Sequence, residues 1–229
     1  MVRIERIENE QTKDAMISLE EAKRKGKDYN TPEVNRALYR IFYGKCYICE
    51  NKGGSSYQIE HLKAHKGNND LKYDWNNLFW VCAHCNNIKL GKYDNILDCT
   101  SEDVDNAIAF RKKGYFGKEE TLEFEALDSR METEATILLL KNVYYGKTPQ
   151  KQIEAKILRK RLRKELSKFK ELVREYKEAE GVDKEDLELL LKRELKNSSE
   201  FTAFKRWLIK DNQEYYFELL QYTSLQLFK

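Results

Sequence analysis

Four cysteines stand in two closely spaced pairs. Two residues lie between the members of each pair and 32 residues lie between the pairs, which comprise Cys46, Cys49, Cys82 and Cys85. At this spacing one tight turn can supply two thiolates, and a closed structural zinc site takes four thiolates in a tetrahedron. The pattern therefore predicts a structural Zn²⁺ site with these four ligands. Because four sulfurs fill the coordination shell, we expect this zinc to take no part in catalysis.

Residues suited to hydrolysing a phosphodiester lie between the two pairs and just after them. His61 can deprotonate a water molecule, because a neutral imidazole is present near pH 7. Glu60 and Asn86 offer the hard oxygen ligands that Mg²⁺ or Mn²⁺ prefers. We expect the amide of Asn77 to tie the backbone of the loop before the second strand, a supporting role. Zinc-held turns would bring Glu60, His61 and Asn86 together.

Each of these residues also has a structural interpretation. A single His at a strand end is commonly a hydrogen-bonded structural residue, and a single Asn is commonly a cap or turn residue. A non-catalytic zinc module that binds nucleic acid or bridges proteins is therefore the alternative function. The presence of Glu60 and Asn86 beside His61 favours catalysis, since binding alone does not need them.

The composition is that of a folded, helix-rich protein. The chain has 229 residues, 41% hydrophobic and 35% charged, with only two prolines, enough for one large domain or two small ones. The longest aliphatic run, Ile137–Leu140, is far too short to span a membrane, and Met1–Arg6 has no apolar stretch of the signal-peptide type. We therefore expect a cytoplasmic protein with no membrane partner. Cys99, the fifth cysteine, is expected to be an ordinary thiol.

Positive charge is concentrated in one stretch, although the net charge is only +3. Residues 141–175 hold twelve Lys and Arg against four Glu, and such a stretch can hold the phosphates of a nucleic acid. Arg159 and Arg163 in this stretch, with Lys89, are the predicted nucleic-acid contacts. The alternative is that the charges form the solvated face of a helix.

Hydrophobic periodicity predicts a strand–loop–strand–helix unit between helical regions. The strands are expected at 57–60 and 78–81, a loop at 67–70 and a short helix at 83–90, after a turn at 52–56. Longer helices are expected at 10–25, from Thr31 to the first cysteine, and at 101–112, 131–143 and 149–178, with two or three shorter ones after Gly181 and after a capping box at 197–200. We expect an N-terminal part, 1–120, and a helical part, 121–229, with a boundary within 115–130.

The segment 46–89 resembles the HNH nuclease motif, the ββα-metal fold, in its zinc-bound form. The resemblance rests on the two cysteine pairs, Glu60-His61, Asn77 and the Asn86-x-x-Lys89 ending. It implies that His61 is the general base, that Glu60 and Asn86 hold the catalytic metal and that Asn77 supports the loop. Because the last position is Asn rather than His, it implies magnesium-type chemistry with one metal. The implied fold class is α+β and predominantly helical, with a zinc-pinned HNH core flanked by helical segments.

A closer resemblance is to the HNH subunit of Septu-type anti-phage defence systems, some of them associated with retrons. It is carried by Cys46–Glu50, Ile59–His61, Trp75–Leu78 and Cys82–Lys89, and it extends over residues 40–165. The group usually has Pro-Lys shortly after the His, where this chain has Ala64-His65-Lys66. The resemblance implies a nuclease, with DNA the favoured substrate, that works with an ABC-type ATPase encoded beside it. The aromatic segment from Phe201 to Phe228 either docks this partner or forms a core of its own.

Overall fold

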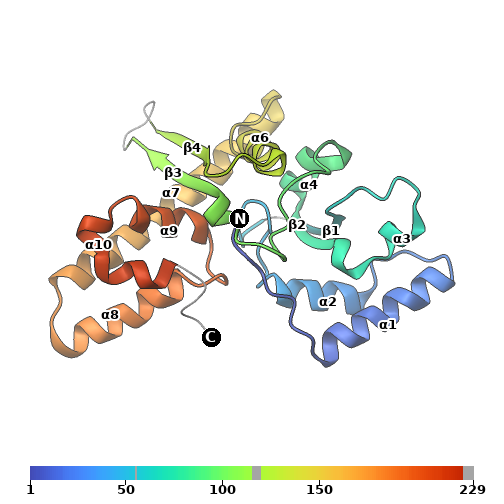
Figure 1. Cartoon of the computed structure of the whole chain (residues 1–229), viewed down its shortest axis with the longest axis horizontal. Helices are drawn as coiled ribbons and strands as arrows, with labels where there is room; N and C mark the ends of the chain where they lie inside the picture. Colours follow the sequence, from blue (N-terminus) through green and yellow to red (C-terminus); the bar gives the residue numbers. More distant parts are fainter. Residues whose placement is uncertain (55, 115–119, 224–229) are drawn as a thin grey trace.

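The computed structural model describes residues 1–54, 56–114 and 120–223 (Figure 1). It is 58% helical and contains two small antiparallel sheets. This confirms the predicted α+β, mostly helical fold class. None of the helices in the described ranges is both long and apolar enough to cross a membrane.

Two helices precede the cysteine pairs, as predicted. Helix α1 (Glu10–Arg24) begins at Asn9, whose side chain accepts a hydrogen bond from the backbone N–H of Thr12. Helix α2 (Pro32–Ile41) begins at Thr31, which caps it in the same way, and carries its proline in the first turn. Helix α2 packs on the hairpin that follows, and its apolar residues are buried. Helix α1 packs against α2 (Figure 1).

The predicted strand–loop–strand–helix unit is present. Strand β1 (Tyr57–His61) pairs antiparallel with β2 (Leu78–Cys82), and α4 (Ala83–Lys89) follows directly. The predicted loop between the strands contains a short helix, α3 (Asn69–Lys72), because Asn68 caps its first N–H groups, and a 3₁₀ turn at Trp75–Asn77. A second 3₁₀ turn, Leu90–Lys92, ends the unit. Of the turn predicted at 52–56, residue 55 lies outside the described residues.

The prediction of one helix over residues 101–112 is wrong. The structure has a short helix, α5 (Val104–Ala107), followed by a strand, β3 (Ile108–Lys113), paired with β4 (Thr121–Ala126). The rings of Phe110 and Phe124 lie opposite each other, 5.5 Å apart, so cross-strand packing overrides the local helical pattern. Burial on β4 alternates, with Leu122 and Phe124 inside, which is the period of a strand and not of a helix.

The remainder of the described chain is helical, as predicted. The helices are α6 (Met131–Tyr145), α7 (Pro149–Glu178), α8 (Gly181–Glu194), α9 (Thr202–Lys210) and α10 (Gln213–Leu220), with a final 3₁₀ turn at Gln221–Thr223. The predicted capping box at 197–200 does not cap α9. This helix begins after Phe201, whose backbone is left-handed, and Glu200 instead accepts a hydrogen bond from the N–H of Lys52.

The main hydrophobic core draws on both sides of residue 120. It joins the N-terminal segment and the hairpin to α6, the first half of α7 and α9, while a smaller core lies between the second half of α7, α8 and α10. The core therefore does not divide at the predicted boundary, of which residues 115–119 lie outside the described part.

The C-terminal aromatic segment contributes to both the interior and the surface. Phe201, Phe204 and Trp207 belong to the main core, whereas the side chains of Tyr215 and Phe217 are 71% and 78% exposed. Phe228 lies outside the described residues. The interpretation of this segment as a core holds for its first part.

Candidate metal centre and active site

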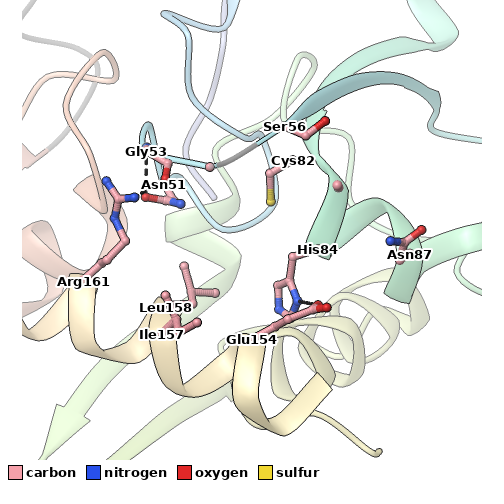
Figure 2. A pocket seen from close by; sticks show the side chains of 12 residues that line it. Asn51, Gly53, Ser56, Cys82, His84, Asn87, Glu154, Ile157, Leu158 and Arg161 are labelled. Atoms are coloured by element: carbon pink, nitrogen blue, oxygen red, sulfur yellow. Dashed lines mark hydrogen bonds and ion pairs between the residues drawn. The ribbon is translucent and has the colours of Figure 1, made fainter. Parts of the chain in front are cut away.

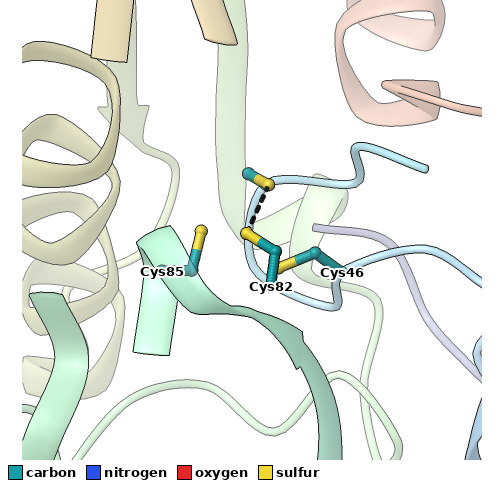
Figure 3. A group of neighbouring side chains, drawn as sticks. Cys46, Cys82 and Cys85 are labelled. Atoms are coloured by element: carbon teal, nitrogen blue, oxygen red, sulfur yellow. Dashed lines mark hydrogen bonds between the residues drawn. The ribbon is translucent and has the colours of Figure 1, made fainter. Parts of the chain in front are cut away.

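The four paired cysteines meet in one buried cluster. Cys46 and Cys49 come from the turn before β1, Cys82 ends β2 and Cys85 lies in α4 (Figure 3). Their sulfur atoms lie within 4.8 Å of one another, and the sulfurs of Cys49 and Cys82 are 3.9 Å apart. Zn–S bonds of about 2.3 Å in a tetrahedron place sulfurs about 3.8 Å apart, so the cluster can hold a zinc ion.

The cluster also anchors neighbouring elements. The N–H of Tyr47, between the first two cysteines, donates to the carbonyl of Trp80 in β2 at 3.1 Å, and the Tyr144 hydroxyl of α6 donates to the Cys49 carbonyl at 3.1 Å. Cys99 is fully buried elsewhere in the core and is not part of the cluster. A metal in this cluster would therefore pin the turn, the hairpin, α4 and α6 to one another.

His61, at the end of β1, has one ring nitrogen oriented by the backbone. Its Nε2 lies 2.9 Å from the carbonyl oxygen of Lys72 in α3, and because a carbonyl only accepts, Nε2 must carry the proton. In the neutral ring the lone pair is then on Nδ1. Burial is the main cause that lowers the pKa of His61 below its usual range, so the ring is neutral at pH 7. Nδ1 is therefore available as a base.

Glu60 lies on the opposite face of β1 from His61, because successive strand residues alternate. The Tyr47 hydroxyl donates to one of its carboxylate oxygens, and the Lys89 ammonium lies 3.3 Å from the other. Burial raises the pKa of Glu60 to about 7, against the opposing effects of Lys89 and Tyr47. The predicted role as a Mg²⁺ ligand does not fit this arrangement, since both oxygens are engaged and a cation already sits beside them.

Asn86 and Asn77 have different surroundings. The Asn86 amide, half-buried on α4, donates to the side-chain oxygen of Gln58 at 2.6 Å, and its own oxygen accepts no hydrogen bond from the described chain. Asn77 is buried and holds the loop as predicted. Its oxygen accepts from the N–H of Lys63 at 2.8 Å, and its amide donates to the carbonyls of Lys63 and Leu71 at 2.9 Å each.

The three predicted catalytic-site residues lie on adjacent elements but have separate partners. Within the described ranges no hydrogen bond or ion pair joins Glu60, His61 and Asn86 to one another. Residues around a metal ion need not bond to one another, so the expectation that the hairpin and α4 bring the three together stays a prediction. Of the residues that orient them, sequence reasoning missed Tyr47 and the carbonyl of Lys72. A backbone carbonyl carries no signal in the sequence.

All three predicted nucleic-acid contacts have a partner within the protein. Lys89 is fully buried and donates to the carbonyls of His61 and Leu62 at 2.9 Å each, so it cannot reach a phosphate in this structure. The Arg159 guanidinium donates to the Tyr144 carbonyl. Arg163 is exposed and pairs with Glu120 at 2.5 Å. Lys89 instead holds the backbone of β1 through the His61 carbonyl.

Replacing Lys89 by methionine is expected to lower the free energy of unfolding by about 1–3 kcal/mol, because it leaves the buried carbonyls of His61 and Leu62 without their donor. Glu60 adds little to this loss, since burial raises its pKa to about 7 and its carboxyl can take up a proton when Lys89 is absent. Urea unfolding followed by circular dichroism measures the loss. A variant as stable as the parent would contradict these buried contacts of Lys89.

A scan against models of protein families, a search of curated proteins and a search of solved structures find no match to this chain. The interpretation of the site therefore rests on the residues and their geometry.

Proposed function

We propose that this chain is an endonuclease of the HNH type that hydrolyses phosphodiester bonds of nucleic acid, with DNA the favoured substrate. The observation that carries the proposal is the orientation of His61. Its Nε2 is committed to the Lys72 carbonyl and its pKa is lowered by burial, so Nδ1 presents a lone pair at neutral pH. A general base that takes a proton from water needs this protonation state.

The remaining parts of the proposed site hold His61 in place. Asn77 ties the loop that carries the Lys72 carbonyl, and Lys89 binds the backbone of His61 itself. Zinc in the cysteine cluster would have four sulfur ligands and no open position, so its role would be to clamp β1 and β2 to α4. These contacts hold the His61 ring in a fixed position, and they leave the proton transfer to His61 itself.

A catalytic Mg²⁺ or Mn²⁺ is also part of the proposal. Mg²⁺ or Mn²⁺ was predicted on Glu60 and Asn86, and only the Asn86 oxygen is without a hydrogen bond from the described chain. Asn86 is thus the one predicted oxygen ligand that fits. The assay below tests whether cutting needs a metal.

The proposed setting follows from the sequence resemblance. It makes an ABC-type ATPase the proposed partner, defence against phage the proposed role and the cytoplasm the proposed location. The exposed rings of Tyr215 and Phe217 on α10 are the proposed contacts with that partner. A non-catalytic zinc module remains the second candidate, favoured by the exposed lysines along α7, which can bind phosphates without cutting.

The test is an incubation of the purified chain with supercoiled plasmid, single-stranded DNA and RNA, in buffers with Mg²⁺, with Mn²⁺ and with neither. We expect cutting that needs one of the added metals and leaves 5′-phosphate and 3′-hydroxyl ends, which ligation and end-labelling detect. The same assay is repeated with the ATPase co-expressed. Binding without cutting under every condition would favour the zinc-module alternative.

A further inference from the structure

A cleft of about 350 Å³ lies between α4 and α7, beside the cysteine cluster (Figure 2). We call it the α4–α7 cleft, and its lining includes Ser56, Ala83, Asn87, Ile157, Leu158 and Arg161. Three segments distant in sequence build it: the turn after the first cysteine pair, the start of α4 and the first half of α7. A cavity of this size lies at the lower end of the range of small-molecule sites, about 300–1,000 Å³.

The walls of the cleft are apolar, and its rim carries hydrogen-bonding groups that are not used within the described chain. Ile157, Leu158 and Ala83 provide the walls. The side chains of Asn87 and Ser56 make no hydrogen bond to any described residue. Apolar walls with a few convergent polar groups are typical of sites that bind a flat organic ligand and fix its orientation.

The guanidinium of Arg161 closes one end of the cleft. It donates to the Gly53 carbonyl through one nitrogen, and its other nitrogens have no further partner in the described ranges (Figure 2). The one acid of the lining, Glu154, forms an ion pair with Lys151 at 2.8 Å and a hydrogen bond with His84 at 2.6 Å. The cleft therefore presents the Arg161 guanidinium to a ligand, whereas the Glu154 carboxylate already has a partner within the protein.

Three basic residues of α7 lie on the same helix face as Ile157 and extend away from the cleft. They are spaced four, three and four residues apart from Ile157 onward: Arg161, Lys164 and Lys168. Lys164 is exposed and has no ion-pair partner among the described residues, and Lys168 is exposed with Glu165 at 2.8 Å. A ligand that fills the cleft and carries a chain of negative charges would match these basic residues.

We propose that the α4–α7 cleft binds one unpaired nucleotide of a nucleic-acid strand, with the base against Ile157 and the phosphates on Arg161 and Lys164. A base has a flat apolar face and polar edges, which suit the walls and the free rim groups of the cleft. This inference rests on the proposed nuclease function and names its substrate class: a strand with unpaired nucleotides. DNA and RNA share this chemistry.

The position of the cleft relative to His61 is compatible with this substrate. The cleft lies at the Tyr57–Cys82 end of the hairpin, and His61 lies at the other end of β1. Tyr57 and His61 are four residue steps apart along β1, a distance of about 13 Å. A nucleic-acid strand held in the cleft would run along β1 over this distance and bring one of its phosphodiesters to His61.

Ile157 and Ile153 provide a matched pair for the test. Both are exposed on α7, by 59% and 63%, and one helical turn separates them, but only Ile157 lines the cleft. Each is replaced by glutamate in a His61→Ala background, which binds without cutting. Fluorescence anisotropy then measures the affinity for a fluorescein-labelled single strand of DNA, the same strand of RNA and the corresponding DNA duplex.

We expect I157E to weaken single-strand binding about tenfold, since it removes an apolar wall and adds a charge beside the phosphates, and I153E to change it by less than about twofold. R161Q should weaken binding more than R163Q, because Arg163 lies outside the cleft. The probe that binds more tightly, single-stranded DNA or single-stranded RNA, identifies which nucleic acid the cleft binds.

Three outcomes would overturn the proposal: equal effects of I157E and I153E, preference for the duplex, or no binding of any probe. Circular dichroism confirms that each variant is folded. Failure of the nuclease proposal is a separate result, since the parent chain would then bind single strands through the cleft and cut none of them. A chain that cuts, but whose I157E variant binds like I153E, would keep the nuclease and exclude the cleft.

Discussion

Replacing His61 by alanine is expected to lower the rate of phosphodiester cleavage by about 10²–10⁴-fold, the usual contribution of a general base. The loss follows from the geometry at the end of β1, where the ring has Nε2 on the Lys72 carbonyl and its lone pair on Nδ1. Initial rates on the best substrate of the assay measure the effect. Zinc content and the circular dichroism spectrum should stay those of the parent, because His61 is not a ligand of the cysteine cluster.

His65 provides the control. Its ring lies 4.9 Å from that of His61, but it has no carbonyl partner in the described chain and accepts only the N–H of Gly67. H65A should therefore keep the cleavage rate within about threefold of the parent, as expected for a variant that removes no reacting group. Equal losses in H61A and H65A would contradict the assignment of the base.

The pH dependence gives an independent check on His61. The ring must be neutral to take a proton, and burial lowers its pKa below the usual value of about 6.5. The midpoint of the loss of activity on acidification should therefore lie below about pH 6.5, since the imidazole becomes charged only as the pH falls through its lowered pKa. A midpoint above pH 7 would show that another group is the base.

Replacing Cys49 by serine is expected to remove tight zinc binding and to lower the melting temperature by about 10 °C or more. The reason is that a structural zinc contributes folding free energy directly, and that in a chain of this size a change of 1 kcal/mol shifts the midpoint by about 2–4 °C. Cys49 is fully buried and its carbonyl also anchors α6 through Tyr144, so the loss should spread beyond the turn. Elemental analysis of zinc and thermal unfolding measure the two effects.

Cys99 is the matched control, since it is the one cysteine of this chain outside the cluster and is equally buried. C99A should keep one zinc per chain. Its free energy of unfolding should fall by no more than about 2 kcal/mol, the usual effect of shortening a small buried side chain. If both variants keep their zinc, the cluster is not a metal site. If both lose it, the loss comes from general unfolding and not from a missing ligand.

The residue types and their spacing determined much of this protein without any structure. Each x2 spacing lets one local turn bring two cysteines together, and the antiparallel pairing of β1 with β2 brings the two pairs into one cluster. The strand–loop–strand–helix order, the caps at Thr31 and the long α7 also follow from local patterns. The strand at Ile108–Lys113 did not, because it exists through pairing with Thr121–Ala126, which a helical pattern within one segment does not reveal.

Only the tertiary structure decided what each polar side chain of the candidate site does. Glu60 and His61 are neighbours in sequence, yet the alternation of a strand sends one toward Tyr47 and Lys89 and the other toward the Lys72 carbonyl. Lys89 is a basic residue of the nuclease-like motif that lies buried as a support. The physical reason is that a side chain's burial and hydrogen-bond partners depend on segments far away along the chain, whereas ligand spacing and helix capping are local.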